Sequence, residues 1–241
     1  MNLLIIKPTE LNGHTALLSG ARSRYVYEFH DLEPNATVPV GILGGGRGHA
    51  RVVTVSRDEI VLEYGADRDS ILARSPISAA VAVSRPQTTK KIIQFAAMAG
   101  FEQLLLFRSA NVDQNYLRSK CLQPEAIEAE VIRGLEQGVD TIPPQIELYG
   151  DFEELAQRIS ARASGERRIA ADPKLGRPAA ALRDTKRPEN KTTFLCVGPE
   201  RGFHSSELER LSSLGFEFAS LGPRILRVEF ALAYLAGIFN D

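Results

Sequence analysis

Thr193-Phe-Leu-Cys-Val197 is an apolar run of strand length. It passes directly into the glycine-containing turn Gly198-Pro-Glu-Arg-Gly-Phe203. A helix is predicted next, over 207–214, with Ser205 or Ser206 as its N-cap and Glu209 as the capping-box partner. A strand that leads through such a turn into a helix is typical of α/β folds, whose ligands bind beyond the carboxyl ends of the strands. The turn is therefore either a ligand-binding loop or an ordinary strand-to-helix connection.

A second passage of the same kind follows further along the chain. The strand-like run 216–220 leads into Leu221-Gly-Pro-Arg-Ile-Leu-Arg-Val-Glu-Phe-Ala231, and an apolar helix is predicted over 225–238. Arg227 and Glu229 would fall in its first turn, where charged side chains among apolar neighbours are either functional or paired. The plainer interpretation is a carboxylate favoured by the helix dipole, together with a surface arginine.

The α/β pattern extends outward from these two loops as far back as residue 76. Further strands are predicted at 78–84, 103–107, 145–149 and 168–171, and helices at 88–99, 124–138 and 152–160. Residues 1–64 differ, because short β-like runs separated by turns predict a small β-barrel with strands at 2–6, 38–43, 50–55 and 59–64. We therefore predict two domains, 1–74 and 75–241.

The composition indicates an ordinary globular protein and excludes several classes. The chain has 241 residues, of which 44% are hydrophobic and 24% charged, with a formal net charge of −1. This charge disfavours a protein that coats DNA nonspecifically. Cys121 and Cys196 are the only cysteines, which suits a reducing compartment, and they form no metal-ligand spacing with the four histidines. Because no apolar segment has the length of a membrane span or a signal peptide, a cytoplasmic protein without membrane or metal is expected.

Two other segments have an unusual composition, one rich in glycine and one rich in basic residues. Gly44-Gly-Gly-Arg-Gly48 fails the template of a dinucleotide-binding loop and lies between β-like runs, which favours a flexible hairpin. The segment 161–191 contains nine Lys or Arg residues against four Asp or Glu, a local charge of +5. It is either a solvated loop or a surface that contacts phosphates.

The two C-terminal motifs together resemble the ribosomal RNA small-subunit methyltransferase E family. The resemblance rests on Gly198-Pro-Glu-x-Gly-Phe203, on Gly215-Phe216, and on Leu221-Gly-Pro-Arg-Ile-Leu-Arg-x-Glu-x-Ala231. It covers 76–241 well and 1–74 weakly. The family is part of the SPOUT superfamily of trefoil-knotted, S-adenosylmethionine-dependent RNA methyltransferases.

The resemblance implies a fold, a reaction and partners. The fold would be a PUA-like RNA-binding β-barrel over 1–74, followed by a knotted SPOUT methyltransferase domain of the α/β class over 75–241. The reaction would be methylation of N-3 of a uridine in small-subunit ribosomal RNA by a homodimer. The residues implied to bind S-adenosylmethionine lie in two loops: Val197, Gly198, Pro199, Glu200, Gly202, Leu221, Gly222, Ile225, Leu226 and Arg227.

Catalysis and RNA binding are assigned to charged residues. Methylation at uridine N-3 requires loss of the imide proton, for which Glu229 is the candidate base and Arg227 the candidate stabiliser of developing charge. The alternative is that this pair is structural. The candidate RNA-binding residues are Arg22, Arg24, Arg47, Arg108 and Arg187.

The chain departs from the family pattern at several positions, notably at Arg201, where the first of two adjacent glycines is usual. His204 stands where the family usually has Ser, and Phe230 where it usually has Thr. Two other function classes therefore stay open. One is a SPOUT methyltransferase with another RNA target, and the other is a non-catalytic RNA-binding or ribosome-assembly protein on the same fold.

Overall fold

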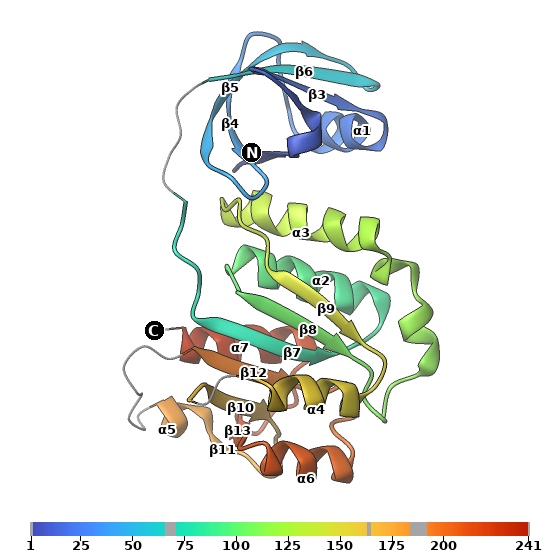
Figure 1. Cartoon of the computed structure of the whole chain (residues 1–241), viewed down its shortest axis with the longest axis vertical. Coiled ribbons are helices and arrows are strands. Elements are labelled where there is room, and N and C mark those ends of the chain that lie inside the picture. The colour runs from blue at the N-terminus through green and yellow to red at the C-terminus, as the bar shows by residue number, and fades with distance from the viewer. Residues whose placement is uncertain (1, 66–70, 163–164, 184–191, 241) are drawn as a thin grey trace. The chain divides into compact units, whose positions relative to one another are not determined.

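The computed structural model describes residues 2–65, 71–162, 165–183 and 192–240, and the chain forms two compact units (Figure 1). The first unit joins Met1–Ala73 to Ile132–Pro143, and the second joins Arg74–Val131 to Pro144–Asp241. The one boundary predicted from the sequence lies between residues 74 and 75. The return of residues 132–143 to the first unit was not predicted.

The second unit is built on a parallel sheet with the strand order β11-β13-β10-β12-β7-β8-β9. The central strands β7, β8 and β12 are almost wholly buried and apolar, as expected for a sheet covered on both faces. This arrangement confirms the predicted α/β class. The strands are β7 (Ile77–Ala82), β8 (Gln103–Phe107), β9 (Gln145–Tyr149), β10 (Arg167–Ala171), β11 (Arg177–Pro178), β12 (Thr193–Val197) and β13 (Glu217–Ser220).

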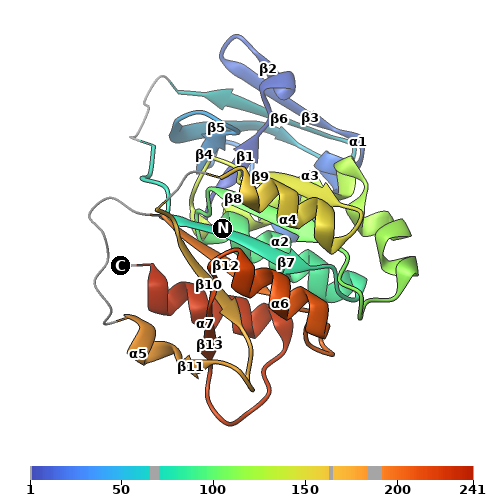
Figure 2. The same ribbon diagram turned by 60° about the horizontal axis from the view of Figure 1, so that its bottom comes forward.

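Helices cover both faces of this sheet (Figures 1 and 2). On one face, α4 (Phe152–Ser160) and α6 (Ser205–Ser213) pack over a core that includes Phe107 and Phe194. On the other, α2 (Pro86–Met98) and α5 (Ala179–Arg183) pack against α7 (Val228–Phe239), which lies on β12. Two short 3-10 turns, η2 (Gln114–Arg118) and η3 (Lys120–Leu122), precede α3 (Pro124–Gly138).

The order of the strands brings three distant loops together. Strand β10 pairs with β12 on one side and with β13 on the other, although both follow it in sequence. Because all three strands are parallel, their carboxyl ends meet at the same edge of the sheet. The loops that leave β10, β12 and β13 therefore lie next to one another.

The first unit contains a mixed sheet with the strand order β1-β4-β5-β6-β3-β2, in which only β1 and β4 pair in parallel. Alternate residues of β3 and β6 and Val26 of helix α1 point into a common apolar core. The sequence predicted four of these strands but neither β3 nor α1. The elements are β1 (Leu4–Ile6), η1 (Pro8–Glu10), β2 (Leu11–Asn12), β3 (Thr15–Ser19), α1 (Gly20–Phe29), β4 (Thr37–Ile42), β5 (Arg47–Val55) and β6 (Glu59–Tyr64).

Residues 132–143 are bound into the first unit by polar contacts. The buried carboxylate of Glu136 accepts hydrogen bonds from the backbone N–H of Ile5 at 3.2 Å and from Arg22 Nη2 at 3.0 Å. The carbonyl of Thr141 accepts one from the N–H of Gly44 at 2.8 Å. Removing either partner of a buried pair leaves an unpaired polar group, so this segment stabilises the unit.

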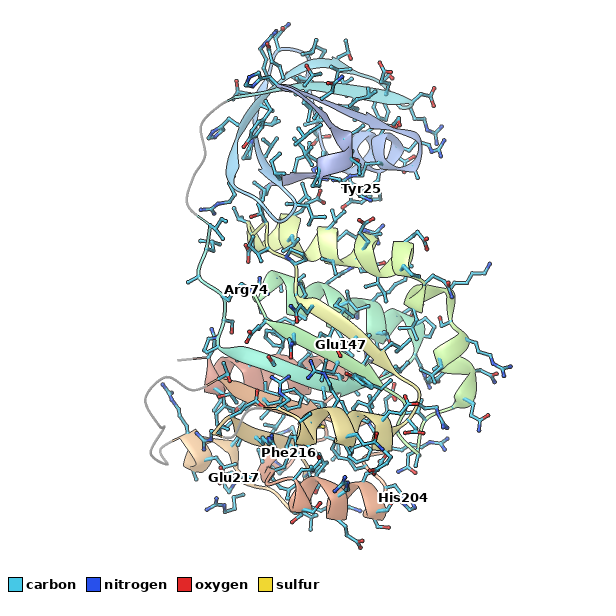
Figure 3. All side chains as sticks on the ribbon, viewed as in Figure 1. Tyr25, Arg74, Glu147, His204, Phe216 and Glu217 are labelled. Atoms are coloured by element: carbon cyan, nitrogen blue, oxygen red, sulfur yellow. The ribbon has the colours of Figure 1, made fainter. Side chains whose placement is uncertain are left out.

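Two helix starts differ from prediction. The predicted cap of α6 by Ser205 or Ser206 with Glu209 is wrong, because the capping box pairs His204 with Glu207 (His204 is labelled in Figure 3). The predicted start of the last helix at residue 225 is also wrong. Helix α7 begins at Val228, so Arg227 is its N-cap residue and does not lie in the first turn. Across the described ranges, no helix combines the length and apolarity needed to cross a membrane.

Candidate functional site

A cavity of about 370 Å³ lies at the carboxyl ends of β10, β12 and β13. Its lining comes from the three strand-end loops and from the nearby faces of α6 and α7; Figure 2 shows the loop that joins β13 to α7 extending beyond the sheet. This volume falls within the range of about 300–1,000 Å³ that is usual for small-molecule sites. The position agrees with the rule that open α/β sheets bind ligands beyond the carboxyl ends of their strands.

The structure brings most of the predicted cofactor-binding residues together around this cavity. Arg227 is the exception, because it is exposed at the N-cap of α7 and does not line the cavity. Those that line it are Val197, Gly198, Pro199, Glu200, Gly202, Leu221, Gly222, Ile225 and Leu226.

The loop after β12 is a tight turn that is stabilised by a hydrogen bond from another loop. The N–H of Gly202 donates to the carbonyl of Pro199 at 2.8 Å, and the φ of +76° at Gly202 explains the glycine there. A Cβ atom added at Gly198 would lie 3.0 Å from the ring of Phe203. Asn111, from the loop after β8, donates through Nδ2 to the carbonyl of Gly202 at 3.0 Å. The backbone of the turn is therefore fixed where it faces the cavity.

The buried carboxylate of Glu207 anchors the same loop and was missed by the sequence analysis. It accepts hydrogen bonds from Ser109 Oγ at 2.8 Å, from the N–H of Ala110 at 2.9 Å and from the N–H of His204 at 2.8 Å. Glu207 is only 3% exposed, so these donors replace the water it gives up. A Glu three residues after the N-cap was the available signal, but a histidine cap concealed it.

The loop after β10 is the third wall of the cavity and was also missed. The carboxylate of Asp172 accepts hydrogen bonds from the N–H groups of Lys174 at 2.8 Å and Leu175 at 2.7 Å. The N–H of Asp172 donates to the carbonyl of Ala219 in β13 at 3.0 Å. A Cβ at Gly176 would lie 2.3 Å from backbone atoms of Ala219 and Ser220, so only glycine fits. A strand over 168–171 was predicted from the sequence, but its neighbours in the sheet were not.

The loop after β13 presents unpaired backbone groups. Within the described part of the chain, residues 221–226 make no backbone hydrogen bond. Gly222 has a φ of +105°, which allows the sharp turn after the strand. Ile225 is 78% exposed and Leu226 is 38% exposed. Free N–H and C=O groups beside a cavity can pair with the polar edge of a ligand.

Glu229, one of the two candidate catalytic residues, is buried against α2. Its Oε1 lies 3.8 Å from Nζ of Lys91, and its Oε2 is buried with no hydrogen-bond partner in the described residues. Glu229 does not line the cavity, whereas Val228 and Ala231 beside it in the helix do. Its ion pair is with Lys91 and not with Arg227.

Two of the candidate RNA-binding arginines are engaged inside the first unit. Arg22 forms an ion pair with Glu136, and its side chain is 15% exposed. Arg47 donates through Nη1 to the carbonyl of Val139 at 3.1 Å. These contacts occupy guanidinium groups that would otherwise be available to phosphates.

The remaining three arginines have different surroundings. Arg24 is exposed on α1. Arg108 donates through Nε to the carbonyl of Gly150 at 2.9 Å and lines a second hollow together with Arg210. Arg187 and most of the C-terminal part of the basic segment 161–191 lie outside the described residues.

Neither cysteine nor any metal-like cluster adds a second chemistry to the site. Burial raises the pKa of the Cys196 thiol far above its usual range, so this residue belongs to the core. Among the described residues, no group of three or more His, Cys, Asp or Glu side chains could hold a metal ion.

Comparisons with known proteins agree with this geometry. Residues 73–240 match the model of the RNA methyltransferase domain family. Ribosomal RNA small subunit methyltransferase E of Treponema pallidum is 25% identical over 240 residues, which cover 96% of this chain and 87% of that protein. The enzyme named ribosomal RNA small subunit methyltransferase E 1 of Borreliella burgdorferi is 24% identical, covering 96% and 94%.

Solved structures share the fold over nearly the whole chain. A ribosomal RNA small subunit methyltransferase E of Neisseria gonorrhoeae, bound to S-adenosylmethionine, has a TM-score of 0.74 at 20% identity and covers 98% of this chain and 95% of its own. A Legionella pneumophila protein described as a methyltransferase, also in complex with S-adenosylmethionine, has a TM-score of 0.77 at 19% identity with the same coverage.

Proposed function

The chain belongs to the RNA methyltransferase domain family, and from this premise we propose that it transfers a methyl group from S-adenosylmethionine to N-3 of a uridine in small-subunit ribosomal RNA. The names of its relatives from Treponema and Borreliella support the ribosomal substrate. The solved structures with bound S-adenosylmethionine support the methyl donor.

The observation that carries the proposal is the cavity at the ends of β10, β12 and β13. The two loops that carry the sequence motifs form two of its walls, although more than a dozen residues and helix α6 separate them in the chain. Two motifs that meet around one small-molecule cavity are hard to explain by packing alone. They are expected if both bind one ligand.

The residues around the cavity fit S-adenosylmethionine. Apolar side chains such as Val197, Leu221 and Leu226 offer a surface for a flat base. The unpaired backbone groups of 221–226 offer donors and acceptors for the polar edge of an adenine. Gly202 and Gly222 have open space where a Cβ would stand, so a ligand can approach the backbone closely at these positions.

The chemistry of this chain's own residues follows from what the reaction needs. When bound, S-adenosylmethionine supplies a methyl group already activated on a sulfonium. Uridine N-3 lies on the pairing edge of the base, so the nucleotide must be unpaired or flipped out of its stack. Glu229 then accepts the imide proton, and Arg227 stabilises negative charge on the flanking carbonyl oxygens. The Oε2 of Glu229 has no hydrogen-bond partner among the described residues and so can accept a proton. Because neither Glu229 nor Arg227 lines the cavity, this role requires the uridine base to reach them from the edge of the cavity.

The proposal extends to topology and assembly. We place a trefoil knot in the second unit, supported by the position of β10 between two strands that follow it and by the shared fold of the solved relatives. The first unit is proposed to be PUA-like. A homodimer is proposed because apolar side chains of Ile225, Phe230 and Tyr234 are more than half exposed around the start of α7.

The test is methyl transfer from isotope-labelled S-adenosylmethionine to small-subunit ribosomal RNA and to assembled subunits. Digestion to nucleosides and mass spectrometry should then identify 3-methyluridine. Label on transfer RNA alone would favour a different RNA target on the same fold. Absence of label from every RNA, together with retained RNA binding, would favour a non-catalytic protein.

Glu229→Gln tests the catalytic assignment, with Lys91→Met as its matched control. The amide keeps the shape of the side chain but cannot accept the proton, so the single-turnover rate should fall about 100-fold or more at saturating RNA and cofactor. Lys91→Met removes the ion pair of Glu229 and should leave the rate within about threefold, since the base itself remains. Equal losses of stability with normal rates in both variants would assign Glu229 a purely structural role.

A further inference from the structure

Three cationic residues line the cavity, one from each strand-end loop: Lys174 after β10, Arg201 after β12 and Arg224 after β13. We call the part of the lining that these residues form the mouth of the cavity. All three residues are exposed. Within the described residues, none of these side chains forms an ion pair or a hydrogen bond. In contrast, Arg158 and Arg162 of the same unit are held by Glu147 and Glu166.

The acidic groups of the cavity do not neutralise these cations. Oδ1 of Asp172 accepts hydrogen bonds from the N–H groups of Lys174 and Leu175 in its own loop, and Asp172 forms no ion pair with the three cations. Glu200 is exposed and has no ion pair with Lys174, Arg201 or Arg224. Counting ionisable side chains, the lining carries three positive and two negative charges. The net positive charge at the mouth of the cavity therefore favours binding of an anion.

We propose that Arg201 and Lys174 bind a backbone phosphate of the RNA beside the nucleotide that enters the cavity. This inference rests on the proposed function, since it assigns the RNA a contact at the same site. The methyl donor cannot by itself satisfy the cations, because its sulfonium and ammonium outnumber its single carboxylate. RNA brings one negative charge with every nucleotide, and flexible Lys and Arg side chains are the usual partners of phosphates.

The position of the two residues explains why such a contact is useful. A phosphate contact carries no sequence information, but it fixes the register of the strand. Held at the rim by loops whose backbones are pinned to Ala219 and Asn111, the strand would present its next base to the cavity. Positioning of this kind accounts for a large part of the rate in group transfer.

The experiment compares Arg201→Ala, Lys174→Ala and the double variant with wild-type protein. RNA affinity is measured at several salt concentrations, and S-adenosylmethionine affinity is measured separately by calorimetry. Each single substitution should weaken RNA binding about three- to tenfold at low salt and lower the salt slope by about one unit. Affinity for S-adenosylmethionine should stay within about twofold. Arg201→Lys, which keeps the charge, should retain the wild-type slope.

Arg158→Ala is the matched control, because it also removes one cation from the second unit but lies on α4, where it pairs with Glu147. It should change neither affinity. A drop in S-adenosylmethionine affinity with an unchanged RNA slope would show that the cations bind the cofactor carboxylate and would overturn the inference. If both variants kept the RNA affinity and salt slope of the wild-type protein, and the wild-type protein methylated RNA, the inference would be overturned and the proposed function would stand. Failure of the wild-type protein to methylate RNA would overturn the proposed function as well.

Discussion

At the scale of single residues, Gly198 is a position where the proposed cofactor site leaves little room for added volume. A valine there would press on the ring of Phe203, which lies 3.0 Å from the Cβ position. We expect Gly198→Val to weaken S-adenosylmethionine binding at least tenfold in calorimetry, because the Phe203 ring that it displaces also lines the cavity. Gly237→Ala on α7 is the control, since a Cβ there meets nothing within 4 Å. Equal affinity in both variants would reject the placement of the cofactor.

Glu207 is the residue through which the loop after β8 holds the loop after β12. Glu207→Gln replaces one acceptor oxygen by an amide donor facing groups that are themselves donors, so it should lower the free energy of unfolding by about 1–3 kcal/mol. It should also weaken cofactor binding, because loop 198–204 loses an anchor. Glu209→Gln, exposed on the same helix, should do neither. Chemical denaturation and calorimetry give the two readouts, and matching behaviour of the two variants would contradict the anchoring role.

His30 should make the stability of the protein depend on pH. Burial lowers the pKa of His30 below the usual histidine value of 6.5, although the nearby Glu136 carboxylate opposes this shift. The unfolded chain therefore binds a proton below about pH 6.5 that the folded chain binds only at lower pH, and the free energy of unfolding decreases as the pH falls through this window. Denaturant unfolding at pH 7 and pH 5.5 measures the decrease.

His30→Gln should make that pH dependence shallower. The matched control is His14→Gln, because His14 is exposed. If His14→Gln flattened the profile and His30→Gln did not, the pH dependence would have another origin.

At the scale of elements, α7 and the loop before it carry the proposed dimer contact. Phe230 is 56% exposed and Tyr234 is 55% exposed, which is unusual for large aromatic side chains and indicates an interaction surface. We expect the wild-type protein to sediment as a dimer at micromolar concentration, and Phe230→Asp with Tyr234→Asp to shift it to a monomer. Met98→Asp, at the exposed end of α2, should remain dimeric. A monomeric wild-type protein would contradict the proposed homodimer.

Most elements of the second unit could be predicted from the sequence because their signals are local. Runs such as 103–107 and 145–149 and the apolar periodicity of 124–138 appear in the structure with the same bounds. The weakly amphipathic α1 and the short strand β3 lacked such signals and were missed. Contacts between distant residues, including the pairing of β10 with β13 and the His204 cap, depend on packing that no local pattern records.

The candidate site shows the same division between local and distant information. Glycines and prolines marked the loops after β12 and β13 in the sequence. The loop after β10 also contains a proline and a glycine, Pro173 and Gly176, but it joins the site only through the position of β10 in the sheet, which the sequence does not show. The surroundings of Glu229 were equally hidden, because Lys91 is distant in sequence and reaches it only through the packing of α2 on α7.

At the scale of the whole molecule, the first unit is discontinuous in sequence. Its sheet and α1 come from Met1–Ala73, whereas Glu136 and Thr141 belong to the later segment Ile132–Pro143. No single cut of the chain separates the two units. A fragment that ends at residue 73 would leave Arg22 without its buried partner Glu136, which is a costly loss.

This discontinuity sets an order of events during synthesis on the ribosome. The amino-terminal unit is completed only after residue 143 has left the exit tunnel, when β7 and β8 have already emerged. One edge of strand β7 then stays unpaired until β12 has been synthesised and pairs with it, and β12 begins fifty residues after residue 143. Nascent chains normally fold domain by domain from the amino terminus, and exposed strand edges invite misassembly in the interval. We therefore expect the yield of folded protein to depend on the speed of translation between codons 143 and 197.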